Sequence, residues 1–503
     1  MLKKYSDIVN EITQAELYEG LLAFGLFSDK LPPIFTSQDF FQYCLTKRSN
    51  FEKRPHCYIY YENMRNINVP RPLAIPNPMA YQLLCNCLKD NWPQLQLHFS
   101  NYTSNQSYKV SRIHIRKMQL TASLFQMNYD NWKTDGSPAI DLSFGKKYLV
   151  KADISSCFPS TYTHALPWAL VTKAVAKADR NQDIWYNEID ACARRVKHNE
   201  TQGLLIGPHT SNLLSEIILV CIDNELKEWD YTRSIDDYSC YVETYEEGQK
   251  FLTELGSSLR AYNLTLNHKK TDILELPLAD TEHWLRKLNA FVLSKGNDII
   301  DYKFVQAYLD HAIELMHDNK NNASILHYAI KVISGKELTY NAKEYFTKTV
   351  LNLSMLYPYL VTILDQFVFS KFCVVCQDHK CISDYANIIY KRGFESRNFE
   401  QVVYAIYFAI KYGFDIHSFD IKEILNSKDC ITMLLGCKYC EKINDKPSKN
   451  VLKEYVKTMI TDEESFDQNW LFGYEILPYN DLFGEWKAVK RNGVKFVKPL
   501  SSW

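Results

Sequence analysis

The sequence lacks an excess of either charge, and it lacks any long apolar run. Its 503 residues include 58 basic and 59 acidic side chains, which gives a formal net charge of −1. A protein that holds a long nucleic-acid duplex usually carries a basic surface. The balance therefore counts against a large duplex footprint, although a local groove could still be basic. Because no run of about 18 apolar residues occurs, we expect no transmembrane helix and no membrane partner.

An export signal is also missing. The N-terminal stretch MLKKYSDIVNEITQAELYEG is too polar for the apolar segment of a signal peptide. We therefore expect a cytoplasmic protein whose 14 cysteines stay reduced. Glycine is scarce, with 16 residues against 34 tyrosines, and this favours helices with aromatic cores over many tightly turned strands.

The hydrophobic pattern divides the chain into three regions. Residues 1–145 are mixed, residues 146–290 alternate strand-like and helical runs, and residues 291–503 are almost purely helical, as in a helical array. In the middle region, YLVKADI predicts a strand, SNLLSEIILVCIDNEL a helix, and SIDDYSCYV a strand, a turn and a second strand. The length allows two or three domains. The predicted fold class is α/β plus α.

Three carboxylates stand out within these runs. Asp153 ends the predicted strand, and the adjacent pair Asp236 and Asp237 interrupts an apolar and aromatic segment. Taken alone, Asp153 could be a helix cap and the pair a solvated turn. If the pair is buried, however, its repulsion and desolvation call for a counter-charge, and Mg²⁺ is a natural one. With Asp153 on a neighbouring strand, the three carboxylates predict a two-metal phosphoryl-transfer site.

Two further segments could serve such a site. TQGLLIGPHTSNLLSEI has glycines at 203 and 207, which let a backbone approach a planar ligand, and it leads into a helix whose N-terminus can accept an anion. The alternative is an ordinary turn into a core helix. Lys269 and Lys270 precede the strand-like TDILEL and could meet a phosphate or donate a proton, or they could simply be solvated.

The order of these segments resembles a known family. ADISSCFPS, QGLLIGPHTSNLLSE, IDDY and LNHKKT are similar to motifs A, B, C and D of reverse-transcriptase polymerases. YTHALPW, directly after motif A, resembles the abortive-infection (Abi) polymerases of bacterial phage defence. The resemblance implies a right-hand palm and fingers without an ordinary thumb, followed by an α-helical, HEAT-like C-terminal domain. The implied boundaries are 1–145 for the fingers region, 146–290 for the palm and 291–503 for the helical domain.

The resemblance also implies a metal-binding set. Asp153 and Asp236 would hold Mg²⁺ or Mn²⁺, Asp237 would support them, and the carbonyl of Ile154 is a further candidate ligand. In this family the residue two positions before the first acid of motif C is usually an aromatic that lies near the primer end. In this chain that residue is Ser234. The departure weakens the expectation of ordinary primer gripping.

Nucleotide contacts are implied by the same match. Phe158 stands where such enzymes place an aromatic ring against the sugar 2′ position, so deoxynucleotides would be favoured. Gln202 and Gly203 would border the incoming base, Arg71 would face the triphosphate, and Lys270 would be the motif D lysine.

The Abi polymerases make DNA without a template and start it on a protein tyrosine, and the resemblance implies the same here. Expected partners are dNTPs, a single-stranded DNA product attached to the protein, and further copies of this chain. Tyr5 and Tyr18 are candidate primers because a mobile N-terminal segment could carry them to the site. Two alternatives remain, namely a templated enzyme of the retron or intron type and a helical sensor or scaffold with an idle palm.

The cysteines contain a weaker signal. Cys373 and Cys376 form one CxxC pair, and Cys437 and Cys440 form another about 60 residues later. Two such pairs can bind zinc. Here each pair lies in or beside an apolar helical run, and cysteine is common in helix packing. We therefore favour packing over a metal site.

Overall fold

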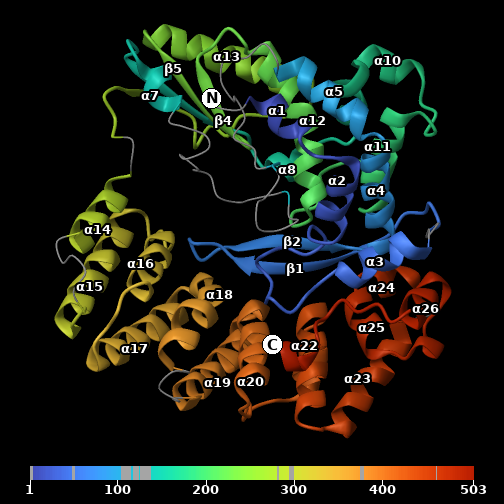
Figure 1. Cartoon of the computed structure of the whole chain (residues 1–503), viewed down its shortest axis with the longest axis vertical. Coiled ribbons are helices and arrows are strands. Elements are labelled where there is room, and N and C mark those ends of the chain that lie inside the picture. The colour runs from blue at the N-terminus through green and yellow to red at the C-terminus, as the bar shows by residue number, and fades with distance from the viewer. Residues whose placement is uncertain are drawn as a thin grey trace.

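The computed structural model describes residues 4–47, 51–103, 115–116, 124, 138–279, 282–293, 299–373, 379–459 and 462–503. A small sheet, a two-stranded ribbon and a long series of helices make up these residues (Figure 1). None of the helices in these ranges combines the length and apolar character needed to cross a membrane.

The sheet forms the centre of the middle region and has four antiparallel strands. Its order is β4–β5–β3–β6. The strands are β3 (Tyr148–Asp153), β4 (Tyr231–Ser234), β5 (Asp237–Val242) and β6 (Asp272–Glu275). The strands predicted from YLVKADI, SIDDYSCYV and TDILEL are therefore confirmed.

Helices cover this sheet and the segments that connect it. The helix predicted from SNLLSEIILVCIDNEL is confirmed as α12, and α13 packs on β3 and β5. At Gly248 in α13, an added Cβ would lie 3.1 Å from the side chains of Val150 and Ile273, so glycine permits this close packing. The helices of the region are α7 (Pro138–Ser143), α8 (Cys157–Ser160), α9 (Ala165–Val171), α10 (Lys173–Ala178), α11 (Trp185–Arg195), α12 (His209–Glu225) and α13 (Tyr245–Ala261).

The N-terminal region combines helices with an antiparallel ribbon. The ribbon contains β1 (Tyr58–Met64) and β2 (Pro70–Pro76), and the prolines of β2 suit a strand with only one partner. Its helices are α1 (Tyr5–Asn10), α2 (Gln14–Leu22), α3 (Gln38–Lys47), α4 (Pro78–Asp90) and α5 (Trp92–Thr103).

The described residues from 299 onward are almost purely helical, as predicted. Together with the preceding helix α14, these helices form an arc that ends beside α3 (Figure 1). They are α14 (His283–Leu293), α15 (Tyr302–Asp318), α16 (Ser324–Ser334), α17 (Tyr340–Leu356), α18 (Val361–Leu364), a π-helical segment (Asp365–Cys373), α19 (His379–Ser396), α20 (Phe399–Tyr412), α21 (Ile421–Asn426), α22 (Cys430–Lys442), α23 (Lys446–Met459), α24 (Glu463–Asp467), α25 (Trp470–Ile476) and α26 (Gly484–Arg491).

The two ends of the chain pack together, which the sequence did not indicate. Buried Asp467 accepts hydrogen bonds from Asn77 Nδ2 (2.7 Å) and pairs with His56 Nδ1 (2.8 Å). Nearby, the ring of Trp470 packs against that of Phe27, with centroids 6.5 Å apart. The C-terminal helices therefore share a core with the N-terminal region.

A buried carboxyl group marks another contact between the ribbon and the helical arc. Glu400, at the start of α20, accepts a hydrogen bond from the backbone N–H of Met64 in β1 (2.7 Å). Its second oxygen, Oε1, is buried and has no hydrogen-bond partner in the described residues. Burial raises the pKa of Glu400 from 4.5 to about 8, and the Met64 bond only partly offsets this.

Replacing Glu400 with glutamine is expected to stabilise the protein at neutral pH. Between pH 4.5 and about 8 the folded state keeps a proton that the unfolded chain has lost, so stability falls as pH rises through this window. Glutamine has no such proton. The variant's free energy of unfolding should exceed the wild-type value by about 2 kcal/mol near pH 7.5 and approach it near pH 4.5.

Urea unfolding at both pH values measures this difference. Glu395→Gln is a matched control, because Glu395 lies at the exposed end of α19 and should shift stability little. An unchanged pH dependence in Glu400→Gln would show that Glu400 does not hold this proton.

Candidate active site

The fold brings the three predicted carboxylates together at one end of the sheet. Asp153 ends β3 and pairs in register with Asp237, the first residue of β5. Asp236 lies in the turn before β5, and its backbone oxygen accepts a hydrogen bond from the N–H of Ile154 (3.0 Å). Asp153 is buried, with 4% of its surface exposed. The strand pairing, and not a flexible loop, therefore sets the spacing of the site.

The turn that carries Asp236 has a strained backbone, and a buried arginine side chain stabilises it through a hydrogen bond. Ile235 has a φ of 59°, which is an outlier for a β-branched residue. Its carbonyl accepts a hydrogen bond from Arg233 Nη1 at 2.8 Å. Arg233 is fully buried and pairs with Glu216 (2.9 Å) and Asp223 (2.6 Å), both on α12. Arg233 thus links the turn to the buried helix α12.

Two side chains from the motif D segment reach Asp153. Lys270 Nζ lies 2.6 Å from Asp153 Oδ2, and Asn267 Nδ2 donates to Asp153 Oδ1 at 2.9 Å. The backbone N–H of Asn267 also donates to the carbonyl of Asp153 (2.8 Å). The structure therefore places Lys270 beside Asp153. It adds Asn267, which the sequence analysis did not single out although it stands in the quoted LNHKKT.

The site carries excess negative charge. Burial raises the pKa of Asp236, and the charge of Asp153 adds to the effect. Burial, followed by the charges of Asp236 and Asp153, raises the pKa of Asp237 to about 6. Lys270 partly offsets both shifts, and the bond to Asp153 in turn raises the pKa of Lys270. A divalent cation would relieve the remaining repulsion.

The donor set fits Mg²⁺ or Mn²⁺, both of which prefer carboxylate oxygens. The ligand atoms of Asp153, Asp236 and Asp237 do not all lie within 4.8 Å of one another. Lys270 occupies one oxygen of Asp153, and 60% of its side chain is exposed, so it has room to move away. The residues present can thus hold a metal after a side-chain rearrangement.

The predicted nucleotide-binding residues of motifs A and B also meet. Phe158 lies in α8, and its carbonyl accepts a hydrogen bond from the N–H of Leu204 (2.8 Å). Gln202 Nε2 donates to the carbonyl of Ser160 at 2.9 Å. Gly203 has a φ of +87°, and a Cβ there would lie 2.8 Å from the carbonyl of Pro159. Only glycine therefore allows the two segments to approach this closely.

Arg71, on the ribbon, acts on the site through its charge. It lies in β2, and its positive charge lowers the pKa of Asp236 against the effect of burial. The guanidinium is therefore within electrostatic range of the carboxylates.

The structure corrects the expectation of a mobile N-terminal segment that carries the priming tyrosine. Tyr5 lies in α1, is 6% exposed, and packs edge-on against Phe99. Tyr18 lies in α2, is 5% exposed, and its hydroxyl accepts a hydrogen bond from Gln82 (3.0 Å). Burial raises the pKa of both phenols. In this conformation neither hydroxyl is available to an incoming nucleotide.

The CxxC cysteines show no metal geometry where they are described. Cys373, Cys437 and Cys440 are buried, and none of them belongs to a metal-ligating cluster among the described residues. Cys376 lies outside the described residues. Packing thus accounts for the three described cysteines.

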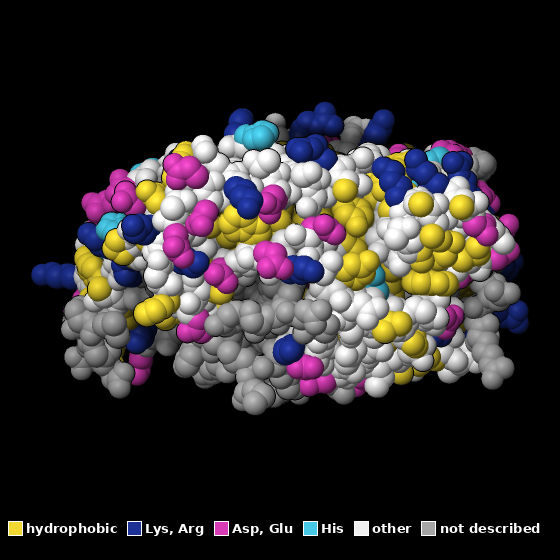
Figure 2. All heavy atoms as spheres, turned by 90° about the horizontal axis from the view of Figure 1, so that it is seen from above, with side chains coloured by type: hydrophobic (Ala, Val, Ile, Leu, Met, Phe, Trp, Pro, Cys, Tyr) yellow, Lys and Arg dark blue, Asp and Glu magenta, His cyan; other side chains and the backbone are white. Residues whose placement is uncertain are grey.

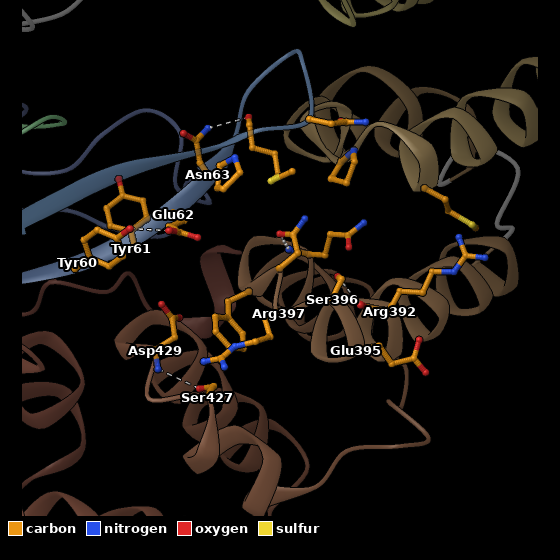
Figure 3. A pocket seen from close by; sticks show the side chains of 18 of the residues that line it. Tyr60, Tyr61, Glu62, Asn63, Arg392, Glu395, Ser396, Arg397, Ser427 and Asp429 are labelled. Carbon is orange, nitrogen blue, oxygen red and sulfur yellow. Dashed lines mark hydrogen bonds between the residues drawn. The ribbon is translucent and has the colours of Figure 1, made fainter. Parts of the chain in front are cut away.

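A large pocket elsewhere does not belong to this site. It measures about 970 Å³ and lies between the ribbon and the helical arc. In Figure 3, Tyr60, Glu62 and Asn63 line one side, and Arg397 and Asp429 line the other. It shares no residue with the carboxylate site. Its basic and acidic side chains are mixed, so its charge does not indicate a particular ligand.

The outer face of the molecule is mixed in charge as well. Figure 2 shows basic and acidic side chains interspersed with apolar patches over the face that is uppermost in Figure 1. This agrees with the formal net charge of −1.

A comparison with protein families covers the segment that carries the carboxylates. A family profile described as reverse transcriptase (RNA-dependent DNA polymerase) matches residues 87–327, which include all three aspartates. No curated protein sequence matches the chain. Among solved structures, a telomerase from Candida albicans in complex with a TWJ fragment of telomeric RNA is similar over 86% of this chain and 70% of its own, at 13% identity. Its TM-score of 0.29 is too low to carry an inference. The chain contains a reverse transcriptase domain and is a nucleotidyltransferase.

Proposed function

We propose that the protein polymerises dNTPs into single-stranded DNA without a template, starting from a protein tyrosine, as part of phage defence. The observation that carries the polymerase chemistry is the convergence of Asp153, Asp236 and Asp237 at the strand ends, with Lys270 beside them. Untemplated, protein-primed synthesis in phage defence rests on the resemblance of YTHALPW to the Abi polymerases.

We assign roles to the site residues as follows. Asp153 and Asp236 hold the metal ions, and Asp237 and the carbonyl of Ile154 support them. When bound, such ions lower the pKa of an attacking hydroxyl and stabilise the departing pyrophosphate. Lys270, once it leaves Asp153, is free to meet the phosphates and to donate a proton to the leaving group.

The remaining contacts position the nucleotide. Phe158 excludes a ribose 2′-hydroxyl, Gln202 and Gly203 border the base, and Arg71 faces the triphosphate. The role of Arg71 is supported by its positive charge, which lowers the pKa of Asp236. Burial argues against Tyr5 and Tyr18 as primers, so the priming tyrosine is left unassigned.

The proposal extends to the architecture. Residues 1–145 would act as the fingers region and 146–290 as the palm. Residues 291–503 would form a HEAT-like domain that replaces the thumb and either guides the product or builds a cytoplasmic homo-oligomer. The nearly neutral charge suits an enzyme that does not grip a long duplex.

A second candidate function is templated synthesis on RNA. The family that matches residues 87–327 is described as RNA-dependent DNA polymerase, and this favours it. In that case the surface between the palm and the helical arc would hold a template and primer.

One experiment separates these functions. Purified protein is incubated with Mg²⁺ and labelled dNTPs, without template or primer, and the products are run on a denaturing gel with and without protease. We expect a ladder that stays with the protein and shifts after proteolysis. Synthesis only after a primed RNA template is added would establish the templated function. Silence under both conditions would point to a sensor or scaffold with an idle palm.

Replacing Phe158 with alanine is expected to weaken the discrimination against ribonucleotides. Removal of the ring leaves room for a 2′-hydroxyl, so the ratio of rNTP to dNTP incorporation should rise by about 10- to 100-fold. Phe158→Tyr keeps the ring and should keep the selectivity. Steady-state incorporation of matched rNTP and dNTP pairs measures the ratio. An unchanged ratio in Phe158→Ala would remove Phe158 from the sugar site.

A further inference from the structure

A cluster of soft metal ligands lies outside the polymerase site, between α4 and α11. Figure 1 shows these two helices side by side, and they are in contact. Cys87 comes from α4, and Glu188 and Cys192 come from α11. One ligand atom from each, namely the two sulfurs and a carboxylate oxygen, lies within 4.8 Å of the other two.

The arrangement is built into the fold. Glu188 and Cys192 are four residues apart on one helix, so their side chains share a face. Cys87 and Cys192 are 4% and 2% exposed, which fixes their positions by packing. Thiolate sulfur with a carboxylate is a donor set that suits Zn²⁺.

The cluster is also accessible to an ion from solution. Cys87, Glu188 and Cys192 line a cavity of about 1010 Å³, together with Lys53. Three protein ligands on the wall of a cavity leave the fourth coordination position for water, as in zinc sites that have only three protein ligands.

The positive charges at the cluster do not block it. Lys53 Nζ pairs with Glu188 Oε1 at 2.9 Å, but 56% of the lysine side chain is exposed. Such exposed pairs are weak, so a divalent ion can displace the ammonium. Arg195 Nη1 lies 3.6 Å from Cys192 Sγ, a contact that favours the thiolate form of the ligand.

We propose that Cys87, Cys192 and Glu188 bind one Zn²⁺ ion, which joins α4 of the N-terminal region to α11 of the palm. Each thiol that enters the site does so as a thiolate, and its proton leaves to solvent. The ion lies apart from the aspartate site, takes no part in nucleotide transfer, and does not depend on the proposed polymerase activity.

Cobalt binding tests the site directly. Reduced, chelator-treated full-length protein is titrated with Co²⁺, and the thiolate-to-cobalt charge-transfer band is followed in the near ultraviolet. We expect one equivalent to bind, and one equivalent of Zn²⁺ to abolish the band. Cys87→Ser and Cys192→Ser should each weaken Zn²⁺ binding by at least about 100-fold, and Glu188→Gln by about 10-fold.

Two further variants guard against misfolding as the explanation. Lys53→Ala removes the competing ammonium from an exposed side chain and should strengthen binding by up to about fivefold. His198→Gln alters a separate group, Cys57–His198–Glu464, whose ligand atoms also lie within 4.8 Å of one another. That variant should bind as the wild type does.

Three results would overturn the proposal. The first is a wild-type protein without the charge-transfer band. The second is a band that survives Cys192→Ser or disappears in His198→Gln. The third is a count of two fewer free thiols than the 14 cysteines after denaturation without reductant, because Cys87 and Cys192 would then form a disulfide instead.

Discussion

Replacing Asp236 with asparagine is expected to lower nucleotide incorporation by about 10³-fold or more. The change keeps the shape of the side chain but removes a charge from the centre of the site, where we propose that Asp236 binds metal. A lost metal contact of about 4 kcal/mol in the transition state corresponds to that factor. Single-turnover incorporation at saturating dNTP measures the loss.

The same variant should not be less stable, and this separates lost chemistry from misfolding. Burial and the charge of Asp153 raise the pKa of Asp236, so the ionised carboxylate destabilises the metal-free fold as pH rises. Asparagine removes that cost, and metal-free Asp236→Asn should unfold at an equal or higher temperature than wild type at neutral pH. Asp310→Asn, on the exposed side of α15, is the matched control and should keep full activity. Retained activity in Asp236→Asn would refute the polymerase assignment.

Local patterns predicted that the three carboxylates would lie close together, as the strand pairing places them. A strand that ends in Asp153 and a hairpin that carries Asp236 and Asp237 are each short and strongly patterned, and antiparallel pairing brings their ends together. Gly203 was a candidate because glycine lets a backbone approach a ligand closely; in the structure it has a positive φ and lies close to the carbonyl of Pro159. The strand end, the hairpin and the glycine turn depend on residues that are close in the sequence, or on strand pairing that the hydrophobic pattern specifies.

Features that depend on long-range packing were not predicted. Asp467 meets His56 and Asn77 across almost the whole chain, and nothing in the local sequence near Asp467 indicates these partners. Tyr5 and Tyr18 were candidate primers because they lie in the N-terminal region, where a mobile segment could have carried them to the site. Their burial follows from packing against α5, α3 and α4, which the sequence alone does not place.

Arg233 is the most consequential residue that the sequence analysis missed. In a four-residue strand, one arginine cannot be distinguished from an ordinary solvent-facing residue. Replacing Arg233 with methionine is expected to cost about 3–5 kcal/mol of the free energy of unfolding, because it leaves Glu216 and Asp223 buried without a counter-charge. Urea denaturation at neutral pH measures the loss. Any folded fraction should also need more Mg²⁺ for activity, since the Ile235 carbonyl loses its donor.

Glu216→Gln is the informative comparison, because the cluster holds two carboxylates for one guanidinium. Burial raises the pKa of Glu216 despite the opposing charge of Arg233, so this carboxylate is the less well compensated partner. Its neutral isostere leaves the Arg233–Asp223 pair intact, with contacts of 2.6 to 3.1 Å. We therefore expect Glu216→Gln to cost less than about 1.5 kcal/mol and to keep activity. If Glu216→Gln proves as damaging as Arg233→Met, both carboxylates must be ionised, and the strained turn depends on the whole triad and not on the Arg233–Asp223 pair alone.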